Sequence, residues 1–143
     1  MIRFEPITPD TWRLPLQVSP EQKSHVAGRA DLLARAYAYR DFRSRALLIC
    51  EDETPVGLIL YYDGWDRDCY VLSELFIDAR YQGKGYGRAA TALALEQMRA
   101  DGRYGKVVLC YIEENDAAKT LYESFGFVET DRDGDEISME LAL

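Results

Sequence analysis

Residues 78–88 read Asp78-Ala79-Arg80-Tyr81-Gln82-Gly83-Lys84-Gly85-Tyr86-Gly87-Arg88, and this glycine-rich stretch carries the strongest signal in the chain. It follows a strand-like segment and precedes a helix-like one. Because the glycines at 83, 85 and 87 carry no side chains, backbone N–H groups can close around an anion there. The start of a helix adds roughly half a positive charge, and Lys84 and Arg88 add full charges. The stretch therefore predicts a pyrophosphate-binding loop.

Two nucleotide-binding motifs with similar glycines do not fit this loop. A Walker A loop has Ser or Thr after Gly-Lys, whereas Gly85 follows Gly83-Lys84 here. The dinucleotide fingerprint G-x-G-x-x-G also differs from the G-x-G-x-G spacing of this loop. A glycine-rich turn without a ligand is the remaining alternative, but it gives no reason for two cations at a helix start. We therefore expect the pyrophosphate of another type of ligand.

The residues on either side of the loop predict a mixed α/β fold with a largely antiparallel sheet. Strands are expected at 2–7, 46–51, 56–62, 69–77 and 106–112, with a last hairpin at 128–130 and 136–141 around Asp133-Gly134. Turns are expected at 52–55 and 63–66. Helices are expected near Thr8, from Ser19 to about Tyr39 with a Ser19–Gln22 capping box, from about 87 to 100, and from 115 to 125 with Gly126 at the end.

The composition is that of one globular domain, residues 1–143, with 48% hydrophobic and 29% charged residues. The net charge of −8 argues against nucleic acid as the main partner, because phosphate binding needs clustered Lys and Arg. The same charge is compatible with a cationic substrate. No apolar run approaches the ~20 residues that span a bilayer. No signal peptide is visible, so we expect no membrane partner.

The cysteine and histidine content bears on localisation and on metal chemistry. Cys50, Cys69 and Cys110 are widely spaced and odd in number, with no CxxC pair. We expect them to be buried or half-buried in a cytoplasmic protein, since the cytoplasm keeps thiols reduced. His25 is the one histidine, and it is expected on an exposed helix face. These observations predict no metal site.

Segments on both sides of the loop, together with the loop itself, resemble the GNAT superfamily of acyl-CoA-dependent N-acyltransferases. Gln82, Gly85 and Gly87 match its Q/R-x-x-G-x-G/A signature, and Glu74-Leu75-Phe76-Ile77-Asp78 precedes them. Residues 115–127 match its N-x-x-A-x-x-L-Y-x-x-x-G-F segment. The resemblance covers about residues 45–141. It implies a single GNAT-type α/β domain whose mixed, mostly antiparallel sheet has a splayed strand pair and flanking helices.

The same resemblance implies a reaction. Acetyl-CoA would be the acetyl donor, and a primary amine would attack it directly. By analogy with relatives that pair, a homodimer is expected.

A finer resemblance is to the bacterial spermine/spermidine acetyltransferase branch. It rests on Gln17-Val18 through Glu21-Gln22, on His25-Val26-Ala27, on Pro55-Val56-Gly57 and on the run 81–87. A polyamine is therefore the favoured small-molecule acceptor. Glu74-Leu75-Phe76-Ile77-Asp78 departs from the Arg-Phe-Met-Ile-Asp that this branch usually carries. The alternatives are another small amine, a protein N-terminus, or a non-catalytic acyl-CoA-binding module.

Acetyl transfer to an amine needs a polarised carbonyl, a deprotonated amine and a leaving thiolate. Tyr122 is the candidate acid, because positions 115, 118, 119 and 122 of a helix share one face and a phenol can protonate a thiolate. Packing of Tyr122 in the core is the alternative. Glu74 is the candidate base, or a group that binds the cationic amine, and its alternative is a solvent-facing strand position.

The resemblance also implies which residues hold acetyl-CoA. Main-chain N–H groups around Phe76 and Ile77 are expected to face the acetyl group and the pantetheine, because a splayed strand leaves such groups unpaired. The expected cofactor-binding residues are Phe76, Ile77, Gln82, Gly83, Lys84, Gly85, Tyr86, Gly87, Arg88, Asn115, Ala118, Lys119 and Tyr122.

Overall fold

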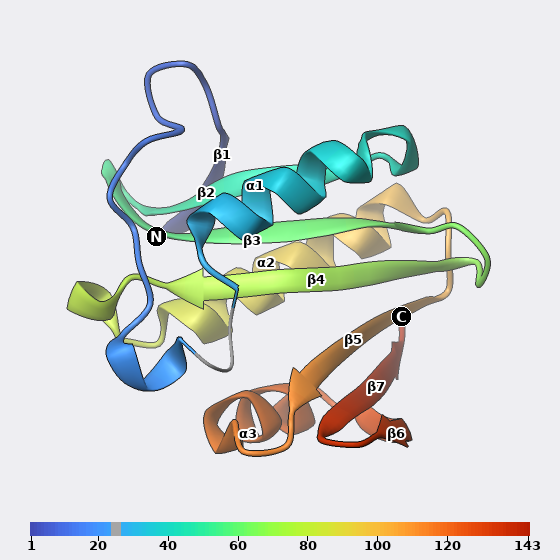
Figure 1. Ribbon diagram of the computed structural model, residues 1–143. Coiled ribbons are helices and arrows are strands. Elements are labelled where there is room, and N and C mark those ends of the chain that lie inside the picture. Colours follow the sequence, from blue (N-terminus) through green and yellow to red (C-terminus); the bar gives the residue numbers. More distant parts are fainter. Residues whose placement is uncertain (24–26) are drawn as a thin grey trace.

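Figure 1 shows the computed structural model of the chain, which describes residues 1–23 and 27–143. Seven strands form one sheet, and every neighbouring pair is antiparallel except one. The predicted mixed, mostly antiparallel sheet is therefore confirmed. The strands are β1 Ile2–Pro6, β2 Arg45–Glu51, β3 Thr54–Gly64, β4 Cys69–Ile77, β5 Lys106–Ile112, β6 Val128–Asp133 and β7 Glu136–Ala142, in the spatial order β1-β2-β3-β4-β5-β7-β6.

Helices cover both faces of this sheet. The α-helices are α1 Arg29–Ala38, α2 Tyr86–Asp101 and α3 Asp116–Ser124, and the short 3-10 helices are η1 Pro20–Gln22, η2 Arg40–Phe42 and η3 Ala79–Tyr81. In Figure 1, α1 lies in front of β2 and β3, and α2 lies behind the sheet. Leu32 of α1 belongs to one apolar cluster, whereas Leu95 of α2 and Tyr122 of α3 belong to the other. Thus α1 covers one face of the sheet, and α2 and α3 cover the opposite face.

The parallel pair, β4 and β5, is joined over a short length only. Its register pairs are Tyr70↔Val107 and Val71↔Val108. Beyond these pairs, residues 72–77 of β4 and 109–112 of β5 have no partner in each other. Backbone groups along this part of both strands are left for other partners, and the functional site lies at this opening.

One residue of β4, Ser73, interrupts the regular pairing of this strand with β3. Leu60 of β3 pairs with Glu74, and the next residue, Tyr61, pairs with Leu72. Ser73 is therefore an extra residue, which makes a β-bulge. A bulge of this kind bends the strand and redirects the side chains that follow it.

The bulge decides which face of the sheet Glu74 occupies. Tyr70 and Leu72 point into the apolar cluster under α2, so strict alternation would send Glu74 to that side as well. Beyond the bulge, Phe76 packs in the cluster under α1. Glu74 has the same phase as Phe76 and faces α1.

The N-terminal part of the chain differs from the predicted helices. Residues 9–13 form turns, and the carbonyl oxygen of Thr8 accepts from the N–H groups of Thr11 and Trp12, both at 3.0 Å. The prediction of a helix starting at Thr8 is therefore wrong. The Thr8 hydroxyl accepts from the N–H group of Asp10 instead, which stabilises a local turn.

The single helix expected from Ser19 to Tyr39 is also wrong, because η1 and α1 are separate elements. Ser19 makes no capping bond to the backbone, and its hydroxyl contacts the Gln22 side chain at 3.4 Å, so no capping box forms. Gly28 is extended just before α1, with φ −77° and ψ 178°, which starts a new helix. The expected exposure of His25 concerns a residue outside the described part.

The other predicted elements agree with the structure within a few residues. Both α2 and α3 are confirmed, and Gly126, with φ of 96°, follows the end of α3. The last hairpin turns at Gly134, as predicted. The turn between β3 and β4 lies at 65–68 rather than 63–66, since β3 continues through Gly64.

All three cysteines are free. Cys50 and Cys69 are buried as predicted, but Cys110 is exposed, which corrects the prediction for that residue. Among the described helices, none is both long and apolar enough to cross a membrane.

Candidate active site

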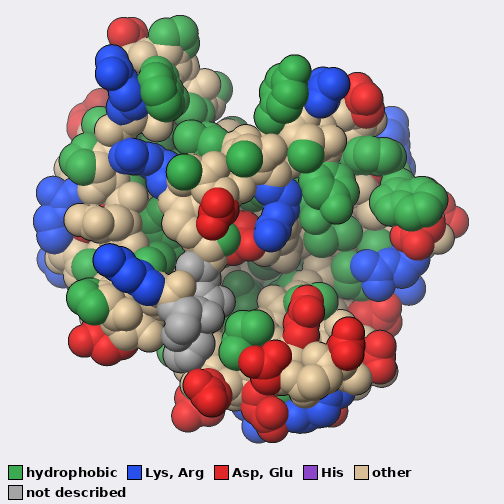
Figure 2. Space-filling view, viewed as in Figure 1, with side chains coloured by type: hydrophobic (Ala, Val, Ile, Leu, Met, Phe, Trp, Pro, Cys, Tyr) green, Lys and Arg blue, Asp and Glu red, His purple; other side chains and the backbone are tan. Residues whose placement is uncertain are grey.

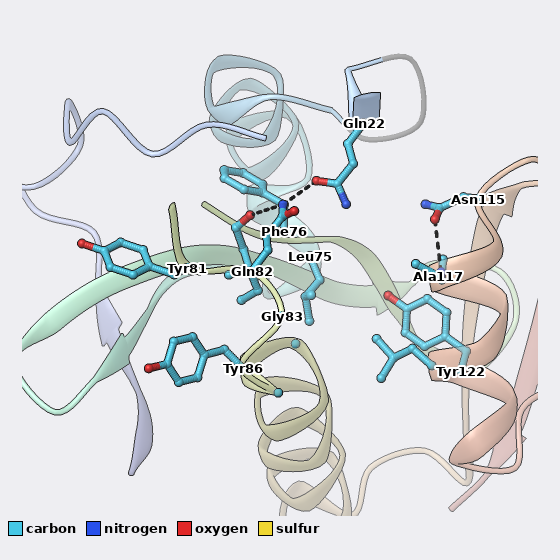
Figure 3. Close-up of a pocket in the computed structure, with 15 residues that line it drawn as sticks. Gln22, Leu75, Phe76, Tyr81, Gln82, Gly83, Tyr86, Asn115, Ala117 and Tyr122 are labelled. Carbon is cyan, nitrogen blue, oxygen red and sulfur yellow. Dashed lines mark hydrogen bonds between the residues drawn. The ribbon is translucent and has the colours of Figure 1, made fainter. Parts of the chain in front are cut away.

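A cavity of about 300 Å³ opens where β4 ends, beside the loop before α2 and the start of α3. Figure 3 shows these elements around it, with the hydroxyl of Tyr122 directed inward from α3. The residues that line it are Gln22, Leu75, Phe76, Ile77, Tyr81, Gln82, Gly83, Gly85, Tyr86, Gly87, Asn115, Ala117, Ala118, Leu121 and Tyr122.

The loop before α2 has a backbone conformation that favours glycine. Gly83 and Gly85 have φ of 79° and 81°, in the left-handed region that residues with a Cβ rarely adopt. Since α2 begins at Tyr86, the N–H groups of its first turn have no acceptor within the helix. Such groups, at the positive end of a helix dipole, suit a pyrophosphate.

Glutamine side chains hold this loop against the strand before it. Gln82 Nε2 donates to the carbonyl oxygen of Ile77 at 3.0 Å and to Oε1 of Gln22 at 2.6 Å (Figure 3). Gln22 comes from the N-terminal segment, 60 residues away in the sequence. The N-terminal segment therefore contributes Gln22 to the wall of the cavity.

Asp78 fastens the same segment from the other side of the loop. Its side chain is almost fully buried and accepts from the backbone N–H groups of Gln17 at 3.0 Å and Arg80 at 2.9 Å. Burial alone would raise the pKa of Asp78, but the Arg80 guanidinium and these hydrogen bonds lower it below its usual value. Asp78 thus stays ionised and anchors the turn.

The structure brings most of the predicted cofactor residues to the cavity: Phe76, Ile77, Gln82, Gly83, Gly85, Tyr86, Gly87, Asn115, Ala118 and Tyr122. The three predicted cations are not part of its wall. Arg88 donates to the hydroxyl of Ser124 at 2.7 Å, and Lys119 pairs with Glu123 at 3.9 Å. Lys84 is exposed between two lining glycines. Contact of these cations with acetyl-CoA stays a prediction.

Sequence reasoning missed several residues of the wall: Gln22, Leu75, Tyr81, Ala117 and Leu121. All but one of them adjoin a predicted residue in the sequence. They were missed because only some positions of the matching segments were assigned to acetyl-CoA. Gln22 is different, since no local pattern connects it with a loop far along the chain. Only the fold brings it there.

Tyr122 lies at the inner end of the cavity. Its side chain is buried, and its ring meets Phe127 edge-on with centroids 5.6 Å apart. Burial raises the pKa of Tyr122 to about 12, and the nearby charge of Glu74 adds to this shift. The phenol is therefore protonated at any physiological pH and is available as a donor.

A narrow passage of about 60 Å³ continues from Tyr122 through the opening between β4 and β5. Tyr122 and Glu74 both line it, together with Ser73 and Cys110. The fold thus brings the two predicted catalytic residues, Glu74 of β4 and Tyr122 of α3, to one small space. We refer to this space as the passage.

Glu74 is ion-paired within this arrangement. Arg35 of α1 donates through Nη1 to Glu74 Oε1 at 2.5 Å and to the hydroxyl of Ser73 at 3.1 Å. Burial raises the pKa of Glu74, while the charge of Arg35 and a hydrogen bond from the Ala27 backbone oppose the rise without cancelling it. The alternative of a solvent-facing Glu74 is wrong, because its side chain is only 13% exposed.

A groove of about 300 Å³ lies beyond the passage on the α1 face and shares Leu72, Ser73 and Cys110 with it. Figure 2 shows this face hollowed at its centre, with acidic side chains gathered below the hollow. The acceptor groove, as we call it, is also lined by Arg35, Tyr39, Tyr62, Arg67, Val71, Val108, Leu109, Thr130, Glu136, Ser138, Met139 and Glu140. Cavity, passage and acceptor groove form a series that crosses the sheet.

Within residues 1–23 and 27–143, no group of three or more His, Cys, Asp and Glu side chains is placed to hold a metal ion.

Comparison with known proteins decides the family. The model of the acetyltransferase (GNAT) family matches residues 9–127. The chain belongs to this family. The predicted GNAT-type domain, and its resemblance to the spermine/spermidine branch, are supported by individual relatives as well.

Relatives of this acetyltransferase include a polyamine enzyme. Spermine/spermidine N(1)-acetyltransferase of Bacillus subtilis (strain 168) is 30% identical over 120 residues, which is 80% of this chain and 78% of the relative. The crystal structure of spermidine N-acetyltransferase from Vibrio cholerae, in complex with CoA and spermine, has a TM-score of 0.78 at 19% identity, over 99% of this chain and 95% of that one. A GNAT family acetyltransferase from Elizabethkingia anophelis with acetyl-CoA bound has a TM-score of 0.68 at 18% identity, over 99% and 98%.

The acetyltransferase uses acetyl-CoA as its acetyl donor, as the family does. The cavity fits this molecule, because the left-handed glycine loop and the free N–H groups at the start of α2 are suited to its pyrophosphate. When bound, acetyl-CoA supplies an activated thioester. The chain is therefore an acetyl-CoA-dependent N-acetyltransferase.

Proposed function

We propose that this acetyltransferase acetylates a primary amine of a polyamine such as spermidine or spermine. The observation that carries the proposal is the placement of Glu74 in the passage, beside Tyr122 and adjoining the acceptor groove through Ser73 and Cys110. A carboxylate there attracts an ammonium group towards the acetyl donor. The polyamine specificity of the Bacillus subtilis relative supports the same acceptor.

The acceptor groove has features that suit an elongated cation. Glu136 lines it, as does Glu140, which pairs with Lys106 at 3.3 Å, and the rings of Tyr39 and Tyr62 stack there with centroids 4.2 Å apart. Aromatic rings accept methylene groups and ammonium groups alike, and carboxylates pair with a second ammonium. A linear polyamine presents these groups in alternation.

The proposed chemistry uses the residues of the passage. Glu74 accepts one proton from the ammonium group, whose free pKa is about 10.4, and the neutral nitrogen then attacks the acetyl carbonyl carbon. The N–C bond forms and the C–S bond breaks. The Tyr122 hydroxyl donates a hydrogen bond to the departing sulfur, and the proton that the acetylated nitrogen loses neutralises the thiolate. Glu74 returns its proton to solvent.

The raised pKa of Glu74 suits this role. A carboxylate with an ordinary pKa is a weak base for an alkylammonium group, and burial brings the pKa of Glu74 closer to neutrality. The same carboxylate also stabilises the ammonium form, so Glu74 acts as a cation-binding group before it acts as a base.

Other acceptors define the alternatives. Another small amine or a protein N-terminus would use the same passage with different contacts in the groove. A non-catalytic acyl-CoA-binding module would not need a buried phenol and a carboxylate together in the passage. We further propose a cytoplasmic location, in agreement with three free cysteines. A homodimer, and no role for nucleic acid or membrane, remain predictions from the family and the net charge of −8.

The test is acetyl-CoA-dependent release of free thiol with spermidine, spermine, lysine, an aminoglycoside and a short peptide as acceptors. We expect release with the polyamines at lower KM than with the other amines. Release with another amine alone would keep the chemistry and refute the polyamine proposal. Binding of acetyl-CoA without release on any amine would favour the binding module.

A further inference from the structure

The groove side of Glu74 is occupied by a cation that belongs to the protein itself. Arg35 Nη1 lies 2.5 Å from Glu74 Oε1 and 3.1 Å from the hydroxyl of Ser73. The Arg35 side chain is 42% exposed, whereas that of Glu74 is 13% exposed. A half-exposed guanidinium thus closes over a largely buried carboxylate.

The position of Arg35 coincides with the route of the acceptor. Arg35 lines the acceptor groove but not the passage, whereas Glu74 lines the passage but not the groove. Ser73, which also accepts from Arg35, lines both. The guanidinium therefore reaches Glu74 from the groove side, which is the direction from which an amine has to come.

An ammonium group and a guanidinium compete for the same carboxylate. Both are cations that donate hydrogen bonds, and Glu74 already accepts from the Ala27 backbone in addition to Arg35. Little of the carboxylate is open to a further donor, because the side chain is so deeply buried. An acceptor cation that binds Glu74 has to displace Arg35.

We propose that Arg35 is a resident cation that occupies the ammonium site of Glu74 and is displaced by the acceptor, so that Arg35 sets the KM for cationic amines. The inference rests on the proposed function, in which an ammonium group binds Glu74. Arg35 acts through Glu74 and is a positioning residue, not a catalytic one. While no amine is bound, it keeps the buried carboxylate compensated.

Removing the resident cation has a consequence for kinetics that a structural role does not have. If only a fraction of the enzyme has Glu74 free, the apparent affinity for the amine is lowered by that fraction. Ion pairs of this exposure contribute modestly, so we expect Arg35→Gln to lower the KM for spermidine about three- to tenfold. Because Arg35 has already left Glu74 in the complex with amine, kcat should stay within about twofold.

Controls separate competition for Glu74 from a general change of charge. Arg40→Gln removes the same charge from the same end of the molecule, where Arg40 stacks on Tyr37 without contact to Glu74, and its KM should equal that of the wild type. Arg35→Lys keeps a cation and should lower the KM for spermidine less than Arg35→Gln does. In the Glu74→Gln background, Arg35→Gln should no longer lower KM. For a neutral alkoxyamine acceptor, Arg35→Gln should lower the KM by less than about twofold.

Binding of methylguanidinium provides a readout that does not depend on turnover. By calorimetry, we expect Arg35→Gln to bind methylguanidinium about three- to tenfold more tightly than the wild type, and Arg35→Gln/Glu74→Gln not to show this gain. Arg35→Ala is measured alongside, because Ala maintains the helix if the Gln variant folds poorly.

The outcomes are separable. If no cationic amine supports thiol release by the wild type, the proposed function is refuted. Methylguanidinium binding then still tests whether Arg35 occupies the cation site of Glu74. A wild type that acetylates amines, with Arg35→Gln showing an unchanged or higher KM and no gain in methylguanidinium affinity, overturns the resident-cation inference and leaves the proposed function intact.

Discussion

Replacing Tyr122 with Phe removes one hydroxyl group from the inner end of the cavity. The ring of Tyr122 packs edge-on against Phe127 at 5.6 Å between centroids, and a Phe ring can keep this contact. No volume is added to the core, so we expect the free energy of unfolding to change by less than about 1 kcal/mol. A kinetic change would then report on the hydroxyl itself.

The size of the kinetic effect follows from the protonation equilibrium. Burial raises the pKa of Tyr122 to about 12. A free thiol has a pKa of about 8.5, so complete proton transfer to the thiolate is uphill by roughly 3.5 units, or ~5 kcal/mol. We therefore expect the phenol to act chiefly as a hydrogen-bond donor to the sulfur as charge develops there. Hydrogen bonds to charged groups contribute about 1.5–3 kcal/mol. We expect kcat to fall about 10- to 150-fold.

The assay is thiol release at saturating acetyl-CoA and amine, with calorimetric titration of acetyl-CoA as a second measurement. Acetyl-CoA affinity should stay within about threefold of the wild type. Tyr104→Phe, which removes a hydroxyl group from a residue packed on Tyr70 outside the cavity, is the matched control. A kcat within twofold of the wild type for Tyr122→Phe, or a loss that appears in acetyl-CoA affinity instead, would show that the Tyr122 hydroxyl does not assist the departure of the sulfur.

Three further changes test other parts of the site. Gly85→Val should weaken acetyl-CoA binding at least about tenfold in calorimetry, because φ of 81° is strained for a residue with a Cβ; Gly134→Val, with φ of 62° in a distant turn, should leave binding unchanged, and equal effects would contradict the loop assignment. Since burial raises the pKa of Glu74, kcat/KM should fall as the pH drops through that raised value; Glu74→Gln should lose this acid limb and raise the amine KM about tenfold, and an unaltered profile would dismiss the role. Asp78→Ala leaves backbone N–H groups of the loop without their acceptor and should cost about 2–3 kcal/mol in urea unfolding; because the pKa of Asp78 is lowered by folding, its contribution is present above the ordinary carboxyl pKa and lost as the pH falls through the lowered value, and a pH-independent difference would argue against it.

The donor side of the site could be predicted from the sequence because its determinants are local. Gly83, Gly85 and Gly87 lie within one loop, and a helix start follows directly, so a few residues specify a backbone that suits an anion. The helix that carries Asn115 and Tyr122 is equally local, and its cap is observed: Asn115 Oδ1 accepts from the N–H of Ala118 at 3.1 Å.

Glu74 could be named from the sequence, but its contacts could not, because they join distant segments of the chain. Arg35 and Glu74 are 39 residues apart in the sequence, and no local pattern in either segment predicts their ion pair. The face of the sheet on which Glu74 lies could not be predicted either. Alternation from Tyr70 and Leu72 would bury Glu74 under α2, and only the extra residue Ser73 turns it towards α1. A bulge has no sequence pattern of its own here, since it lacks glycine.

The N-terminal segment shows a third kind of difference. The Ala- and Leu-rich stretch before Tyr39 has helical propensity, which favoured one long helix from Ser19. The chain instead uses residues 14–22 to reach the loop at Asp78 and Gln82, so long-range hydrogen bonds override the local preference. Propensity predicted α1 but not where it begins.

The short pairing between β4 and β5 leaves the sheet as two units joined along a seam. One unit holds β1 to β4 with the glycine loop, and the other holds β5, β7 and β6 with α3. The acetyl-CoA cavity takes its walls from both, with Phe76 and Gly85 on one side and Asn115 and Tyr122 on the other. Whatever binds there spans the seam.

A ligand bound in the cavity would therefore help to hold the two units together. A molecule present at a hundred times its Kd stabilises the native state by about 2.7 kcal/mol through mass action. Openings of the seam that are smaller than global unfolding should be suppressed most, because they break the ligand's contacts with one unit. We expect amide protons of β5 from Leu109 to Ile112 to exchange with deuterium more slowly when acetyl-CoA is bound, while those of β2, remote from the seam, change little. Bound acetyl-CoA would then stabilise the contact between the two units of the sheet, and its release would weaken that contact.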